Sequence, residues 1–391
     1  PDYPNTWLRL TRQGSVFTIW YGADGTTWNK YCDIDTAGSL NGFGNPFPDP
    51  VLVGVAVTAH NDGDPTGGIA TVSDLSVTVT PSTPILTPVT QVQDASTYVG
   101  SDAHFSFTVT NSAIANGSAA NYQWYKNDQP VTGANGTIFS VFASPEDNGA
   151  KVYCTASLPG ASVNSATGTV SVATATEYPG FVKYQVYPGR QRADVNIGNY
   201  GPANRVSAMP GFEAPVNWSE NFGSRLSGYF IPPASGDYVF FISADDDADL
   251  FLSTDSSPAN IRWIAQQEGW AGNRQWQTHG GGGSSVAAFQ RRSDNFSPDE
   301  GITYPWLAGL PLVAGQKYFI MATHREGGGG DNLGVYAWNK ADPEPADGDP
   351  SNLTGDAVSM LTWPPTSLEI TTQPQDVDVF EGLNAVMQVA V

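Results

Sequence analysis

The chain has 391 residues, a length that suits two to four domains. Its 42 Gly and 29 Pro residues favour many short strands and turns over long helices, so the composition predicts a nearly all-β protein. The formal net charge of −21 argues against binding to nucleic acid or to an anionic membrane surface, because both require basic patches. No run of 18 apolar residues occurs, so we expect no membrane insertion. The sequence begins at Pro1 without an export signal, and we expect a fragment or processed piece of a larger exported protein.

Residues 1–80 show the alternation of apolar and polar side chains that is typical of strands. The expected strands are Leu8–Leu10, Val16–Tyr21, 51–61 and 71–79, and the expected hairpin turns are Gln13-Gly14 and Asp24-Gly25. The strings at Trp7–Leu10, Ala23–Trp28 and Val53–Asn61 resemble those of concanavalin- or laminin-G-like jelly rolls. This resemblance implies the carboxy-terminal half of such a domain.

Residues 81–175 contain the strings WYKNDQPV and SPEDNGAKVYCTAS, which resemble those of an immunoglobulin-like sandwich. The resemblance implies that Trp124 is the buried core tryptophan. The position expected for a cysteine partner of Cys154 holds an aromatic residue, and Cys32 falls in the preceding domain. We therefore expect both cysteines to be unbridged.

Residues 366–391 repeat the beginning of that unit, since ITTQPQDVDVFEGLNAVMQVAV parallels PVTQVQDASTYVGSDAHFSFTV. They predict a truncated second immunoglobulin-like domain. Tandem modules of this kind usually serve as spacers, which favours a surface architecture.

An Asp245-Asp246-Asp247 cluster lies between two apolar strands in the segment GDYVFFISADDDADLFL. Adjacent residues of an extended strand point to opposite faces, so Asp245 and Asp246 can reach one cation together only if the backbone between them is kinked. A cis peptide bond gives that kink, and a shared divalent ion can stabilise it against a cost of about 3 to 4 kcal/mol. The cluster therefore predicts a calcium site, and an acidic solvated turn is the alternative interpretation.

The same segment resembles the protective-antigen lectin-like family, the PA-fourteen domains, through Gly236, Tyr238, Phe240 and the aspartates that follow. A second landmark of the family is a Gly-rich loop before an alternating strand, and HREGGGGDNLGVYAW at residues 324–338 matches it. The resemblance places a PA-fourteen-type β-sandwich at residues 176–365.

In lectin members of that family, an Asp-Asp pair joined by a cis peptide bond and an Asn of the late loop bind calcium, which in turn binds sugar hydroxyls. The resemblance therefore implies Asp245, Asp246, Asp331 and Asn332 as metal ligands. Asp331 and Asn332 compete for one ligand position, and Asp247 stands where the family usually has Gly.

The Gly-rich loop is the second part of the expected carbohydrate site. We expect Gly329 and Gly330 to contact the sugar together with the four metal-site residues, because glycine lets the backbone approach a ligand closely. A mobile hairpin loop is the alternative. A long insertion at residues 264–300 carries Trp270, which we choose for stacking on a pyranose ring, with a core or rim position as the alternative.

The sequence lacks Gly-x-Ser-x-Gly, His-Glu-x-x-His and phosphate-loop strings, so we expect no enzyme activity in these residues. The predicted fold class is all-β, a multidomain chain of β-sandwiches. The predicted function is calcium-dependent binding of a glycan or polysaccharide by part of a secreted or cell-surface, bacterial protein, with the oligomeric state left open. The alternatives are accessory modules that hold an enzyme outside this chain on a polysaccharide, and a purely structural stalk.

Overall fold

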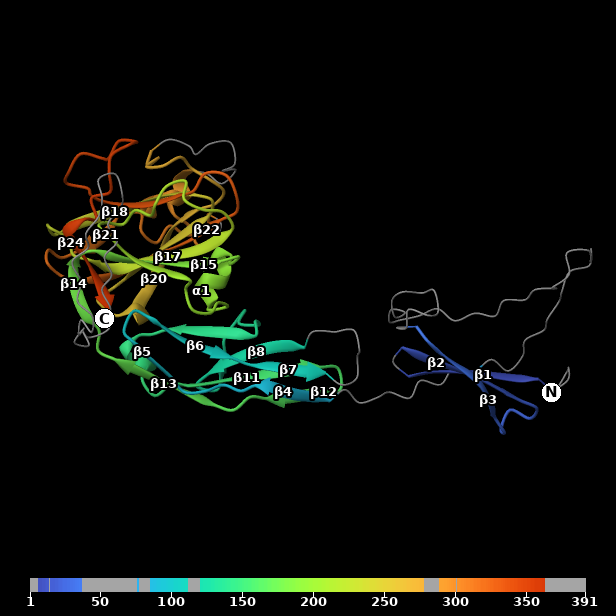
Figure 1. Ribbon diagram of the computed structural model, residues 1–391. Coiled ribbons are helices and arrows are strands. Elements are labelled where there is room, and N and C mark those ends of the chain that lie inside the picture. The colour runs from blue at the N-terminus through green and yellow to red at the C-terminus, as the bar shows by residue number, and fades with distance from the viewer. Residues whose placement is uncertain are drawn as a thin grey trace, which may run out of the picture. The chain divides into compact units, whose positions relative to one another are not determined.

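The computed structural model describes residues 6–13, 15–36, 76, 85–111, 120–277, 288–299 and 301–362. Within these residues nearly all of the regular structure is β, and the single α-helix is α1 (Arg192–Ile197), which confirms the predicted fold class (Figure 1). The same residues contain no helix long and apolar enough to cross a membrane. The strand expected at 51–61, nearly all of the one expected at 71–79, and the repeat at 366–391 lie outside the described residues.

The first sheet contains β1 (Trp7–Gln13), β2 (Val16–Gly22) and β3 (Asn29–Asp35) in that order. The β1–β2 pair is antiparallel, with Gln13 opposite Val16, so both predicted strands are confirmed. Asp24 shapes the next turn, because its Oδ1 accepts hydrogen bonds from the backbone N–H groups of Thr26 and Thr27 at 2.8 and 2.7 Å. The assignment of this sheet to a jelly roll stays a prediction.

Strands β5 to β13 form what we call the central sandwich. Its larger sheet has the order β5-β13-β11-β8-β9 with β12 beside β11, and β6 pairs with β10 in a second sheet. Trp124 is completely buried, and its Nε1 donates to the Gly136 carbonyl at 2.8 Å. A separate two-stranded sheet pairs β4 (Leu86–Thr90) with β7 (Thr108–Asn111). The 3-10 turn η2 (Pro145–Asp147) precedes β11. The strands of the sandwich are β5 (Ala95–Tyr98), β6 (Asp102–Ser106), β8 (Asn121–Lys126), β9 (Gln129–Pro130), β10 (Ile138–Phe142), β11 (Lys151–Leu158), β12 (Ala161–Asn164) and β13 (Gly168–Ala173).

Both cysteines are free, as expected. Cys154 is buried, and this burial raises the pKa of its thiol to about 12. A thiol with so high a pKa carries almost no thiolate at neutral pH, so Cys154 packs as a small apolar residue.

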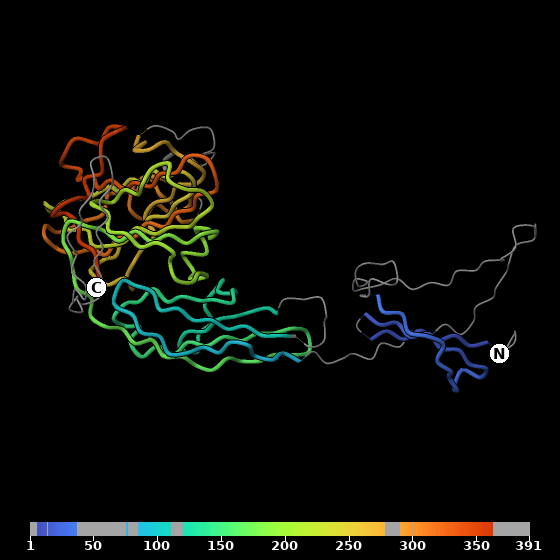
Figure 2. The backbone as a smooth tube through the Cα atoms, in the orientation of Figure 1, coloured from blue at the N-terminus to red at the C-terminus, as the bar shows by residue number. Residues whose placement is uncertain are grey.

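Strands β14 to β24 form the large sandwich. Its eight-stranded sheet has the order β14-β24-β17-β22-β19-β20, with β15 beside β17 and β16 beside β15, and the other sheet is β21-β18-β23. The strands are β14 (Thr176–Gly180), β15 (Val182–Pro188), β16 (Arg205–Met209), β17 (Phe222–Phe230), β18 (Gly236–Asp245), β19 (Ala248–Ser253), β20 (Ile261–Gln267), β21 (Leu310–Leu312), β22 (Tyr318–Glu326), β23 (Asn332–Asn339) and β24 (Gly355–Thr362), with 3-10 turns η3 (Pro258–Asn260), η4 (Ala288–Arg291) and η5 (Ser293–Asn295). Figure 2 traces this part of the chain from green to red.

Strand β18 is buried on both of its faces. Phe240 and Ile242 lie in the main core between the sheets together with Ile320 of β22. Phe241 points the other way, because side chains alternate along a strand, and packs in a second cluster with Trp276. Trp276 of the insertion therefore contributes to the burial of the outer face of β18.

Four strand ends meet at one edge of the large sandwich. Strand β18 ends at Asp245, which pairs with Asn332 at the beginning of β23. Strand β19 begins at Ala248, which pairs with His324 near the end of β22. The predicted Asp cluster and the Gly-rich loop are therefore brought to the same edge by the register of the two sheets.

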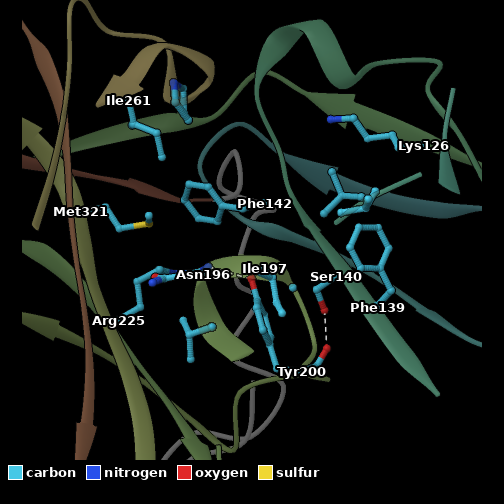
Figure 3. Close-up of a pocket in the computed structure, with 15 residues that line it drawn as sticks. Lys126, Phe139, Ser140, Phe142, Asn196, Ile197, Tyr200, Arg225, Ile261 and Met321 are labelled. Carbon is cyan, nitrogen blue, oxygen red and sulfur yellow. Dashed lines mark hydrogen bonds between the residues drawn. The ribbon is translucent and has the colours of Figure 1, made fainter. Parts of the chain in front are cut away.

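A buried ionic cluster joins the central and large sandwiches, and all of its residues lie in one compact unit. Arg225 of β17 is 1% exposed and forms an ion pair with Asp102 of β6. Its guanidinium also donates to the hydroxyls of Tyr187 and Tyr200, each at 2.8 Å. Arg225 and Phe142 line a cavity of about 280 Å³ beside this cluster. Figure 3 shows these two side chains among those that line it.

Replacing Asp102 with Asn should leave the Arg225 charge buried without a counter-charge. The expected loss in the free energy of unfolding is about 3 to 5 kcal/mol, measured by urea unfolding. Glu344→Gln is the control, because Glu344 is 40% exposed where it pairs with Arg292, and its loss should be below about 1 kcal/mol. Equal losses in the two variants would contradict this account of the junction.

Lys183 of β15 is a second buried cation at the junction. Its Nζ donates to the Gly100 carbonyl at 2.6 Å and to the Tyr98 hydroxyl at 3.2 Å. Burial, with the nearby Arg225 charge adding to it and Asp102 opposing it, lowers the pKa of Lys183 from 10.5 to about 7. Between these two values the folded chain binds fewer protons than the unfolded chain, so stability rises with pH.

Lys183→Met should remove this pH dependence. The free energy of unfolding of the unchanged protein should gain up to about 1.4 kcal/mol per pH unit relative to the variant as the pH rises from neutral toward 10. Urea unfolding of both proteins across this range measures the difference. Parallel pH profiles would show that Lys183 is not titrating in the folded chain.

Candidate functional site

Asp245 and Asp246 stand at the turn between β18 and β19. The peptide bond between them is cis, as the family resemblance implies. The Asp246 N–H donates to the Arg325 carbonyl at 3.2 Å, and the Arg325 N–H donates to the Asp247 carbonyl at 2.9 Å. The turn is thus held against the end of β22 by main-chain hydrogen bonds, and the side chains of all three aspartates are half-buried.

The Gly-rich loop lies against the two carboxylates. The Gly327 N–H donates to Asp246 Oδ2 at 2.9 Å. A Cβ atom at Gly327 would lie 2.9 Å from the same oxygen, and a Cβ atom at Gly330 would lie 3.3 Å from Asp245 Oδ2. Glycine at these positions therefore lets the loop backbone approach the carboxylates closely. Gly329 has a φ of +119°, a conformation that side chains rarely adopt.

Asn332 lies directly across the sheet from Asp245. Its Nδ2 donates to the Ala271 carbonyl at 2.9 Å, which fixes the amide group. Its Oδ1 is buried and has no hydrogen-bond partner. Buried polar atoms are almost always hydrogen-bonded, so this oxygen is an acceptor that suits a bound ion.

Asp331, the competing candidate, is already engaged. It is 3% exposed, and its Oδ2 accepts hydrogen bonds from the backbone N–H groups of Trp218 and Ser219, each at 2.7 Å. The Asn217 N–H donates to its carbonyl at 2.9 Å. Asp331 therefore holds segment 217–219 against the Gly-rich loop through its Oδ2, whereas Asn332 has a buried oxygen without a partner.

Segment 217–220 is the part of the site that sequence reasoning missed. Glu220 accepts a hydrogen bond from the Gly329 N–H at 2.8 Å, and Trp218 is 39% exposed. No motif marks this segment, because it joins the site only through hydrogen bonds to residues more than 100 positions away.

The two insertion tryptophans have different environments. Trp270 is 38% exposed, and the Ala271 N–H beside it donates to the Ala244 carbonyl at 2.7 Å. This bond holds Trp270 near the end of β18, where the predicted sugar contact requires it. Trp276 is 1% exposed and packs in the core.

Negative charge dominates the site. Burial, followed by the charges of Asp246 and Asp331, raises the pKa of Asp245 to about 6. Burial also lowers the pKa of His324, so its ring is neutral near pH 7, and its Nε2 lies 2.7 Å from the Asp245 carbonyl. Arg325 Nη1 is 3.9 Å from Asp246 Oδ2. One arginine at this distance leaves most of the acidic charge uncompensated.

The candidate metal ligands at this edge are oxygen atoms of side chains and of the backbone. Within the described ranges, no group of three His, Cys, Asp or Glu side chains by itself forms a metal-binding cluster. The atoms that fit a hard cation are the carboxylates of Asp245 and Asp246, the Asn332 amide oxygen and the backbone carbonyls of the loop.

Comparison with known families identifies part of the large sandwich. Residues 173–269 match the PA14 domain family. The matched residues include Asp245 and Asp246 on the turn after β18, whereas the Gly-rich loop lies beyond them. This family is the one that the two sequence landmarks resemble.

Two curated relatives share short stretches with the chain. Fibrocystin of Canis lupus familiaris is 26% identical over 144 residues, which cover 35% of this chain and 3% of fibrocystin. Fibrocystin of Mus musculus is 34% identical over 74 residues, which cover 18% of this chain and 2% of that protein. The chain therefore corresponds to a small part of the length of these relatives.

Solved structures with partial likeness include a fungal adhesin domain. The A domain of Epithelial Adhesin 6 from Candida glabrata, in complex with Galβ1-3GlcNAc, is 13% identical, with 49% of this chain and 90% of that chain covered and a TM-score of 0.30. An anti-sigma factor domain-containing protein from Clostridium clariflavum is 11% identical, with 70% and 83% covered and a TM-score of 0.28.

Asp331→Ala should release segment 217–219 from the Gly-rich loop. Hydrogen bonds to a charged acceptor contribute about 1.5 to 3 kcal/mol each, so amide hydrogen exchange at Trp218 and Ser219 should become at least about tenfold faster. Hydrogen-exchange mass spectrometry measures the change, with the β17 amides as internal control. Unchanged exchange at the two amides would show that Asp331 does not hold the segment.

Proposed function

We propose that the PA14 domain binds a glycan through a calcium ion at the edge formed by Asp245, Asp246 and the Gly327–Gly330 loop. The observation that carries the proposal is the meeting of these two carboxylates with the loop backbone and with the unpartnered Asn332 Oδ1. An all-oxygen set with excess negative charge suits calcium, which takes six to eight oxygen ligands. In this proposal Asp331 positions the site.

Each part of the site has a distinct role in this proposal. Asp245, Asp246 and Asn332 would hold the ion, and calcium supplies coordination positions that vicinal sugar hydroxyls can occupy. Gly329 and Gly330 leave space for a ring at the loop. Trp270 is half-exposed at the same edge and offers an apolar face for stacking against that ring.

The proposal extends to the whole chain. We infer that the central sandwich and the other flanking segments are non-catalytic modules of a larger protein that is secreted or held at a cell surface. The match of residues 173–269 to the PA14 domain family supports a binding role for the large sandwich. A glycan or polysaccharide is the proposed partner.

Calcium titration calorimetry tests the metal site. Asp245→Ala combined with Asp246→Ala should weaken calcium binding by more than about 100-fold, because it removes two charged ligands at once. Asp247→Ala is the matched control and should bind calcium like the unchanged protein, since Asp247 joins the turn through its backbone.

A glycan array with and without a chelator tests the function. We expect glycan signals in calcium that disappear both in the chelator and in the double variant. Calcium binding that is equal in the double variant and the unchanged protein would refute the proposed ligands. Absence of calcium and glycan binding in both proteins would favour a structural stalk.

A further inference from the structure

Glu326, the last residue of β22, is a buried carboxyl group without a partner at the edge of the large sandwich that carries Asp245 and Asp246. Its side chain is 1% exposed, and neither of its carboxylate oxygens has a hydrogen-bond partner. Buried polar groups are nearly always hydrogen-bonded, and a buried charge is nearly always paired. A carboxyl group that is buried without any partner therefore points to an interaction with something the polypeptide does not supply.

The other buried carboxylates of the described residues do have partners. Asp102 pairs with Arg225, Asp147 with Lys126, and Asp249 with Arg192 at 3.2 Å. Asp331 accepts two backbone N–H groups. Glu326 differs because neither of its oxygens has a partner, whereas Asp249 lacks a partner only at Oδ1.

Side-chain alternation along β22 places Glu326 on the inner face of its sheet, near the Asp245-Asp246 turn. Ile320, Ala322 and His324 precede it at alternate positions of β22, and the first two line the core between the sheets. Alternation places Glu326 on the same inner face, one step beyond His324, whose Nε2 lies 2.7 Å from the Asp245 carbonyl. Glu326 thus lies inside the sandwich, next to the turn that carries Asp245 and Asp246.

The charges around Glu326 are all of one sign. Its own burial and then Asp246, Asp245, Asp331 and Glu220 raise the pKa of Glu326 to about 8. The nearest arginine in the sequence, Arg325, directs its Nη1 toward Asp246 at 3.9 Å. A cation held by Asp245 and Asp246 would place a positive charge near Glu326 as well.

We propose that Glu326 is a buried anionic support of the cation site: it lies within the sandwich behind Asp245 and Asp246, and its negative charge strengthens their hold on the ion. The inference rests on the proposed function, because it requires a divalent cation at Asp245 and Asp246. It adds a negative charge behind the two ligating carboxylates, and groups outside the coordination shell typically change metal affinity by about 10- to 100-fold. The ligand class is a hard divalent cation with oxygen preference.

Glu326→Gln separates this role from a structural one. The variant keeps the shape of the side chain and removes its charge, and it breaks no hydrogen bond of Glu326. Its affinity for calcium, measured by calorimetry on the full chain, should fall by about 10- to 100-fold. In the presence of a chelator at pH 7 its melting temperature should stay close to that of the unchanged protein, because a pKa of about 8 leaves Glu326 largely protonated there.

Asp249→Asn is the matched control, since Asp249 is a buried carboxylate of the same sandwich that has its own arginine. It should lose stability equally with calcium and with chelator, and should keep its calcium affinity. Glu326→Asp retains the charge on a shorter side chain and should show an affinity between those of the unchanged protein and Glu326→Gln, which provides a test even if the Gln variant fails to fold.

The outcomes are distinguishable. Glu326→Gln that binds calcium as tightly as the unchanged protein would overturn the role of Glu326 and leave the proposed function standing. Equal destabilisation of Glu326→Gln in calcium and in chelator, with affinity unchanged, would assign Glu326 to the fold. An unchanged protein that binds no calcium would overturn the proposed function and this inference together.

Discussion

The antiparallel register of β18 and β23 is the constraint on which the site depends. It sets Asp245 opposite Asn332, and so brings a turn and a loop that are more than 80 residues apart in the sequence to one edge. A shift of one residue would turn the buried side chains of β18 toward the wrong face. Because Phe240 and Phe241 are both completely buried, on opposite faces, the core holds this register firmly.

Buried polar and charged groups of the large sandwich occur in two different environments. At the junction with the central sandwich, the Arg225 guanidinium is surrounded by an aspartate, two tyrosines and a glutamine, so its hydrogen-bonding needs are met within the chain. At the acidic edge, in contrast, buried acceptors such as Asn332 Oδ1 have no hydrogen-bond partner within the chain. Completed networks rigidify a fold, whereas incomplete ones mark positions where a ligand belongs.

Sequence reasoning predicted the all-β class and the turn at Asp245 and Asp246, because strand alternation and a dense acidic turn are local patterns. It also placed the Gly-rich loop near that turn through the family landmarks. It left Asp331 and Asn332 as competing ligands, and the hydrogen bonds in which their side chains differ are not visible in the sequence.

Other features were out of reach for the same reason. The environment of Glu326 depends on strand pairing and on the burial of one strand end, neither of which is visible in a string such as HREGGGG. Segment 217–220 enters the site through contacts with distant residues, and its letters carry no signal of their own. Trp270 and Trp276 looked alike in the sequence and differ only because one covers β18.

The family match ends at residue 269, but the sheets do not. Strand β22 pairs along the whole of β17, and β23 pairs with nearly all of β18. β18 therefore finds both of its neighbours, β21 and β23, only after that boundary, whereas β17 keeps β15 on one side and loses β22 on the other. A piece cut at the boundary would have long, bare strand edges and only part of the acidic edge, and bare strand edges promote aggregation. The smallest autonomous form of this domain therefore extends to the end of β24.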